Sequence, residues 1–159
     1  MALLVAGVGN VLRGDDGFGV AVAHRLEAEG VPPGVRVLDI GIGGIHLVQE
    51  LLDPVEALIV VDAVELGRPP GTVAVIEPEV PVPRGPDDLA DMHYATPERA
   101  FMLAGALGAL PSALWLVGCQ PRDANRLEDV LSPEVEAAVE RAAAEVRRLA
   151  TELGFSWGR

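Results

Sequence analysis

The sequence predicts an α/β protein, a three-layer α/β/α sandwich whose five-stranded, mostly parallel sheet contains one antiparallel strand. Short apolar runs bounded by glycine or proline alternate along the chain with segments of helical periodicity, and this alternation is typical of a parallel sheet covered on both faces. The chain has 159 residues, half of them hydrophobic. We therefore expect a single domain over residues 1–159 with one sizeable core.

The first half of the chain predicts three buried strands and two helices. Residues 2–8, 35–40 and 57–64 are apolar runs of strand length. Between them, residues 17–29 and 45–52 place apolar side chains three or four positions apart, as the buried face of a helix requires. The order strand–helix–strand–helix–strand indicates that these strands are parallel.

The second half predicts two further strands and two further helices. The fourth strand, at 72–78, follows a connection of only about seven residues, too short for a crossover helix, so it should be antiparallel. A proline-rich loop occupies 78–95. The pairs Thr96–Pro97 and Ser132–Pro133 each predict an N-cap followed by the first residue of a helix, and 113–118 predicts the strand between those helices.

Composition narrows the classes of function. The formal net charge is −12, which disfavours nucleic acid and anionic membranes as partners and favours a cation, a basic peptide or a neutral molecule. No apolar run is long enough to cross a bilayer, and the first residues lack the basic region of a signal peptide. The single cysteine permits no internal disulfide, so we expect a cytoplasmic protein. We also expect a monomer, because no long apolar helix face is left over.

Acidic residues stand where the predicted parallel strands end. Asp16 follows the first strand, Asp39 ends the second and Asp62 ends the third, while His93 lies in the long loop. Ligands of such sheets bind beyond the carboxyl ends of the strands, so Asp16, Asp62 and His93 can converge there. Two carboxylates and an imidazole suit a divalent ion such as Ni, Zn, Fe or Mn, and the sequence therefore predicts a metal site.

Each of these residues also has a structural interpretation. Asp15 or Asp16 can cap the first helix with its carboxylate. Asp62 can be an ordinary polar residue at a strand end, and His93 can lie on the surface. Cys119 follows the last strand, where we expect a small buried side chain rather than a nucleophile.

Other classes of site fit less well. The turn GVGNVL has Leu12 where a dinucleotide-binding turn has its third glycine, although Asp39 would suit a ribose. A nucleotide-binding module thus remains an alternative. The chain contains no G-x-S-x-G and no H-E-x-x-H motif, which excludes those hydrolases. His24 and His46 lie on predicted helices among apolar neighbours, and we expect both to be structural.

Several motifs together make the chain resemble the hydrogenase maturation endopeptidases. In order, these motifs are GVGNVLRGDDGFG (7–19), the glycine turn DIGIGG (39–44), VVDAV (60–64), PGTV (70–73), LVGCQP (116–121) and LSPEVEAAVERA (131–142). The resemblance implies a metal-dependent hydrolase that is classed as an aspartic-type endopeptidase. Such an enzyme removes a short C-terminal peptide from the nickel-loaded precursor of a [NiFe]-hydrogenase large subunit and so activates that enzyme.

The resemblance also implies roles for particular residues. Asp16, Asp62 and His93 match the positions that bind the metal and support catalysis in the family, and Asp39 or one of the metal-site carboxylates is a possible general base. The nickel is carried by the substrate, so the resting enzyme is expected to be metal-free.

The chain departs from the family pattern in the turn after the second strand. Ile40 and Ile42 stand where the family usually has a glycine and a threonine. This departure leaves the choice of substrate open. A precursor-binding chaperone without proteolytic activity is therefore a second alternative.

Overall fold

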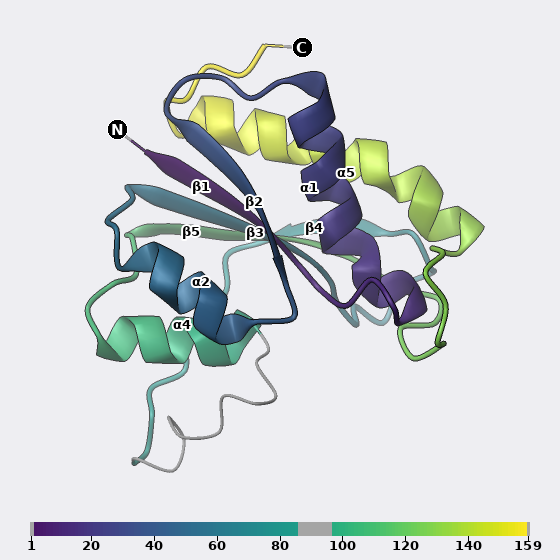
Figure 1. Cartoon of the computed structure of the whole chain (residues 1–159), viewed down its shortest axis with the longest axis horizontal. Helices are drawn as coiled ribbons and strands as arrows, with labels where there is room; N and C mark the ends of the chain where they lie inside the picture. The colour runs from purple at the N-terminus through teal and green to yellow at the C-terminus, as the bar shows by residue number, and fades with distance from the viewer. Residues whose placement is uncertain (1, 86–96, 159) are drawn as a thin grey trace.

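The computed structural model describes residues 2–85 and 97–158, in which a five-stranded sheet lies between two layers of helices (Figure 1). The predicted strands and helices are present in the predicted order, and the predicted ends that fall within these residues agree within about two residues, as expected of boundaries read from a sequence. The elements are β1 (Leu3–Val8), η1 (Gly14–Gly17), α1 (Phe18–Glu29), β2 (Val35–Gly41), α2 (Gly44–Leu51), β3 (Ala57–Ala63), β4 (Val73–Ile76), α4 (Pro97–Ala106), β5 (Ala113–Cys119) and α5 (Pro133–Glu152).

The strands lie in the order β2–β1–β3–β5–β4. The first four are parallel, and β4 is antiparallel to β5, as the short connection before it predicts. Because the parallel strands end on the same side, the residues that follow them gather at one side of the sheet, which we call the carboxyl edge. β4 begins at this edge, since Val73 pairs with Cys119.

A hydrophobic cluster covers each face of the sheet. α1 and α5 pack on one face, against strand residues such as Val5 and Ile59 (Figure 1). α2 and α4 pack on the other face, against the intervening residues such as Ala6 and Val60. Successive strand side chains alternate between the faces, so strands that are apolar at nearly every position suit a sheet covered on both sides.

The start of α1 touches β1 and β3 through backbone. A side chain at Gly19 would overlap the carbonyl oxygens of Val8 and Val61, and one at Gly7 would overlap the backbone of Gly19. Glycine at these positions lets the helix approach the strand ends closely. This contact fixes the turn between β1 and α1 at the carboxyl edge.

The beginnings of the last two helices match the prediction in part. Pro97 and Pro133 are the first residues of α4 and α5. Thr96, the predicted N-cap of α4, lies outside the described residues. Ser132 is the N-cap residue of α5, but its side chain makes no capping hydrogen bond, because the hydroxyl donates to the carboxylate of Asp15 at 2.7 Å instead.

Among the helices within the described ranges, none combines the length and the apolar character that crossing a bilayer requires. The longest, α5, has 20 residues, but glutamates and arginines occupy its outward face.

Candidate active site

Asp16 and Asp62 come together at the carboxyl edge. Asp62 is near the end of β3 with 8% of its surface exposed, and Asp16 is half-buried in η1. Burial raises the pKa of the Asp62 carboxyl well above its ordinary value. The negative charges of Asp16 and, to a smaller extent, Glu98 of α4 raise this pKa further. A hydrogen bond from the N–H of Ala63 lowers it in part. Asp62 therefore favours the neutral form unless a cation compensates its charge.

The turn after β1 holds Asp16 in place. The N–H of Asn10 donates to Oδ2 of Asp16 at 2.8 Å. Gly9 has a φ of +141°, and a side chain on it would overlap the carbonyl oxygen of Asp16. Neither Asp15 nor Asp16 caps α1. The N-cap residue of this helix is Gly17, and no side-chain hydrogen bond caps the helix, so the capping interpretation is wrong for both aspartates.

The chemistry of this pair fits a cation. Within residues 2–85 and 97–158, the groups that act on Asp62 are two carboxylates and a backbone N–H, with no basic side chain among them. The same part of the chain contains no group of three or more His, Cys, Asp or Glu side chains placed to hold a metal. His93, the third predicted ligand, lies outside the described residues. The three-residue metal site therefore stays a prediction.

Asp39 lies apart from this pair. Its Oδ2 is 2.9 Å from Nε2 of His24 on α1. Val37, two residues before Asp39, packs under α1 and α5, whereas Val60, two residues before Asp62, packs under α2 and α4. Because strand side chains two apart share a face, Asp39 and Asp62 project from opposite faces of the sheet. The role of Asp39 as general base stays a prediction.

The two helical histidines are more exposed than predicted. The His24 side chain is 63% exposed and pairs with Asp39. The His46 side chain is 46% exposed, with its Nε2 3.5 Å from Glu50 one turn further along α2. Both occupy the outward faces of their helices, so they are surface residues rather than parts of the core.

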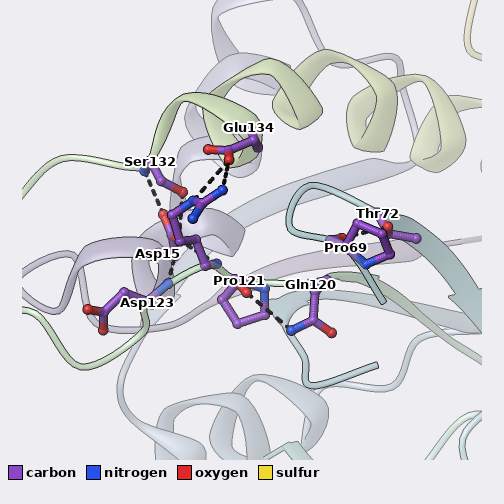
Figure 2. Close-up of polar contacts among 9 residues, drawn as sticks. Asp15, Pro69, Thr72, Gln120, Pro121, Asp123, Ser132 and Glu134 are labelled. Carbon is purple, nitrogen blue, oxygen red and sulfur yellow. Dashed lines mark hydrogen bonds and ion pairs between the residues drawn. The ribbon is translucent and has the colours of Figure 1, made fainter. Parts of the chain in front are cut away.

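Asp15 has a structural role that the sequence does not reveal. Its buried carboxylate accepts hydrogen bonds from the N–H groups of Arg122 (2.8 Å), Asp123 (3.0 Å) and Ser132 (2.6 Å) and from the Ser132 hydroxyl (Figure 2). Burial alone would raise the pKa of Asp15, but these hydrogen bonds outweigh it and hold the pKa below its ordinary value. Asp15 thus anchors the loop after β5.

Gln120 joins two loops at the same edge. Its buried side chain accepts hydrogen bonds from the N–H of Leu66 at 2.6 Å and of Arg68 at 3.4 Å, both in the loop after β3. Its amide donates to the carbonyl of Pro121 at 3.1 Å (Figure 2). A buried amide satisfied in this way fixes the two loops relative to each other.

Cys119 is a buried residue, as predicted. It is fully enclosed beside α5, and burial raises the pKa of its thiol to about 11. The thiol is therefore protonated at neutral pH, and a protonated thiol is a poor nucleophile.

Comparison with known proteins agrees with this architecture. The hydrogenase maturation protease family model matches residues 20–149. The hydrogenase expression/formation protein HupD of Rhodobacter capsulatus is 37% identical over 148 residues, covering 92% of this chain and 70% of HupD. HupM of Azotobacter chroococcum is 38% identical over 154 residues, covering 96% of this chain and 73% of HupM.

Two solved structures share the fold. The hydrogenase maturating endopeptidase HybD from E. coli superposes with a TM-score of 0.75 at 29% identity, over 97% of this chain and 94% of HybD. A hydrogenase 2 maturation peptidase from a Thaumarchaeota archaeon gives a TM-score of 0.71 at 38% identity, over 98% of this chain and all of that one. The predicted α/β fold class is confirmed.

The chain belongs to the hydrogenase maturation protease family. Its enzymatic class is accordingly that of a hydrolase acting on peptide bonds. This assignment confirms the resemblance seen in the motifs and favours proteolysis over the nucleotide-binding alternative.

Proposed function

We propose that this protein removes a short C-terminal peptide from the precursor of a [NiFe]-hydrogenase large subunit. Family membership supports the reaction. The pair Asp16 and Asp62 is the structural observation that locates the proposed active site. In this pair the buried carboxyl of Asp62 has a raised pKa, in part because of the negative charge of Asp16. Such a pair is poised to receive positive charge at the edge where α/β proteins bind their ligands.

Nickel held by the precursor is the cation that we propose for this site. Asp16, Asp62 and His93 are the residues that would contact it, and two carboxylates with an imidazole suit nickel. His93 precedes Pro97 by four residues, and Glu98, the next residue of α4, is close enough to act on the pKa of Asp62. The nickel is part of the substrate, so the resting enzyme needs no metal of its own.

The candidates for the general base are the metal-site carboxylates, Asp16 and Asp62, and Asp39. Hydrolysis places the hydroxide of water on the carbonyl carbon and a proton on the leaving nitrogen. A bound cation lowers the pKa of a carboxylate that ligates it, so the carboxylate that takes the proton from water would be one that does not ligate the nickel at that step. Asp39, paired with His24 on the other face of the sheet, is the alternative.

We further propose that the protein acts as a cytoplasmic monomer. A net charge of −12 disfavours both self-association and contact with anionic membranes. Cys119, the one cysteine, is buried and forms no disulfide, which suits a reducing compartment.

Mass spectrometry of the large-subunit precursor from the same organism tests this function. Nickel-loaded and metal-free precursor are each incubated with the protein, and the loss of a C-terminal peptide is followed over time. We expect cleavage of the nickel-loaded precursor alone. Asp16→Asn and Asp62→Asn should each slow cleavage by about 100-fold or more, the scale expected for a lost acid or base.

A matched variant controls for the change of charge. Asp53→Asn alters an exposed aspartate in the turn that follows α2, at the opposite edge of the sheet, and should cleave like the unaltered protein. An uncut precursor in both metal states would instead support the chaperone alternative. Equal cleavage with and without nickel would contradict recognition of the metal.

A further inference from the structure

Exposed apolar side chains occur in the two turns that follow β1 and β2 and in the first turn of α2. Leu12 is 64% exposed and Ile42 is 68% exposed, while Val11, next to Leu12 in the chain, and Ile45, in the first turn of α2, are nearly half exposed. We call these four residues the apolar rim. Single exposed apolar side chains are common, but a group of them at one edge of a protein indicates a surface that binds a partner.

The two turns start next to each other. β1 and β2 are neighbouring parallel strands, and Val8 pairs with Gly41 at their ends. The N–H of Gly9 then donates to the carbonyl of Gly41 at 2.9 Å, just before Ile42. The two turns that carry the rim residues therefore start at adjacent points of the carboxyl edge.

Hydrogen bonds couple the rim directly to Asp16. The side chain of Asn10 accepts from the N–H of Leu12 at 2.9 Å, while the N–H of Asn10 donates to the Asp16 carboxylate at 2.8 Å. The carbonyl of Asn10 accepts from Arg13 at 3.0 Å. One ordered turn thus orients the acid into the site and presents Leu12 to solvent.

The two isoleucines that depart from the family pattern have different environments. Ile40 is buried and packs in the cluster under α2 and α4, so its apolar side chain serves the core. Ile42 faces solvent and contributes to neither cluster. The interior of the protein therefore gives no reason for an apolar residue at position 42.

We propose that the apolar rim binds apolar side chains of the large-subunit precursor next to the peptide bond that is cut. The inference rests on the proposed function, since a polypeptide that reaches Asp16 passes the turn that also carries Leu12. A second copy of the chain is a poorer occupant, because it would bring together two molecules that each carry a charge of −12. Burial of the rim against the precursor would lower KM and leave the chemical step unchanged.

Steady-state kinetics on nickel-loaded precursor test this proposal. The double variant Leu12→Ser/Ile42→Ser should raise KM about tenfold or more with kcat unchanged, since it removes two apolar contacts. Leu52→Ser/Leu107→Ser is the matched control, because these side chains are 61% and 58% exposed at the ends of α2 and α4, at the opposite edge. The control should keep the KM of the unaltered protein, and Leu12→Met/Ile42→Leu should keep most of the affinity.

Each other outcome has a definite meaning. An unchanged KM in the serine double variant overturns the proposal while the proposed function stands. Sedimentation that shows a dimer dissociated by the same substitutions assigns the rim to self-association and also overturns it. Absence of cleavage by the unaltered protein overturns the proposed function and this inference with it. If circular dichroism shows the double variant unfolded, the single variant Ile42→Thr is measured in its place and must raise KM.

Discussion

The carboxylate of Asp15 accepts hydrogen bonds from both the N–H and the hydroxyl of Ser132, at 2.6 and 2.7 Å, although 117 positions separate the two residues. The turn after β1 is thereby tied to the N-cap residue of α5. Backbone bonds from Gly14 to Glu128 and from Asp15 to Asp123 strengthen the same connection. Asp15 therefore stabilises the scaffold on which its neighbour Asp16 faces the site.

Asp15→Asn should destabilise the fold at neutral pH. An amide has one acceptor oxygen in place of two charged ones, so hydrogen bonds to Arg122, Asp123 or Ser132 are lost. We expect the free energy of unfolding at pH 7 to fall by about 1–3 kcal/mol, measured by chemical denaturation.

Lowering the pH should abolish most of this difference. A carboxyl whose pKa is lowered by folding contributes stability above its ordinary pKa of 3.8 and loses it as the pH falls through the lower folded value. The unaltered protein should therefore lose more stability than Asp15→Asn between pH 5 and about pH 3. A gap between the two proteins that stays constant with pH would contradict the assigned hydrogen bonds.

Asp62→Asn should stabilise the metal-free protein while it abolishes cleavage. The raised pKa of Asp62 means that ionising this carboxyl destabilises the fold. The protonated carboxyl stabilises the folded state fully below the ordinary pKa of aspartate, and this stabilisation is lost as the pH rises through the pKa of the folded protein. With a chelator present, thermal unfolding at pH 8 should show the variant to be the more stable protein, and the two proteins should converge near pH 4. A variant less stable at pH 8 would show that Asp62 is compensated by a charge not yet identified.

Cys119→Ala should leave cleavage of the precursor intact. The thiol is fully buried and its pKa is about 11, so it cannot act as a nucleophile at neutral pH. Loss of its sulfur creates a small cavity, and we expect a cost of about 1 kcal/mol in stability. Iodoacetamide should leave the native protein unmodified at pH 8, as mass spectrometry can check, and modification within minutes would contradict the buried position.

Gly9→Ala should impair catalysis as well as stability. A methyl group there would overlap the carbonyl oxygen of Asp16, and the φ of +141° is strained for any residue except glycine. Asp16 must shift, and we expect cleavage to slow by about tenfold or more, as misplaced catalytic groups do. Gly85→Ala is the control, because a methyl group at Gly85 meets no atom of residues 2–85 or 97–158 within 4 Å. Equal rates for the two variants would show that the position of Asp16 is not critical.

The fold could be predicted because it depends on local patterns. The antiparallel direction of β4 follows from a connection too short to hold a helix, and the start of α5 follows from Pro133. The closeness of Asp16 and Asp62 could also be predicted from the sequence, because parallel strands bring their carboxyl ends to one edge. The sequence alone thus identifies the edge and two of its acids.

Other parts of the site depend on contacts that no spacing reveals. The bond between Asp15 and Ser132 forms only when α5 lies beside η1, so Ser132 was predicted as a cap and Asp15 as a capping acid. The face from which Asp39 projects depends on the register of β2, and its partner His24 then follows. The exposed positions of His24 and His46 depend on how each helix is rotated about its axis.

The hydrogen bonds of the turn after β1 also restrict how the sequence can change in length. Gly9 is hydrogen-bonded to the end of β2, Asn10 to Asp16, and Asp15 to the loop after β5. These three residues of the turn therefore have fixed partners. A single inserted or deleted residue would move every later partner out of reach. We therefore expect alignments with relatives to contain no gap between Gly9 and Asp16, and gaps to accumulate in exposed segments such as residues 79–82.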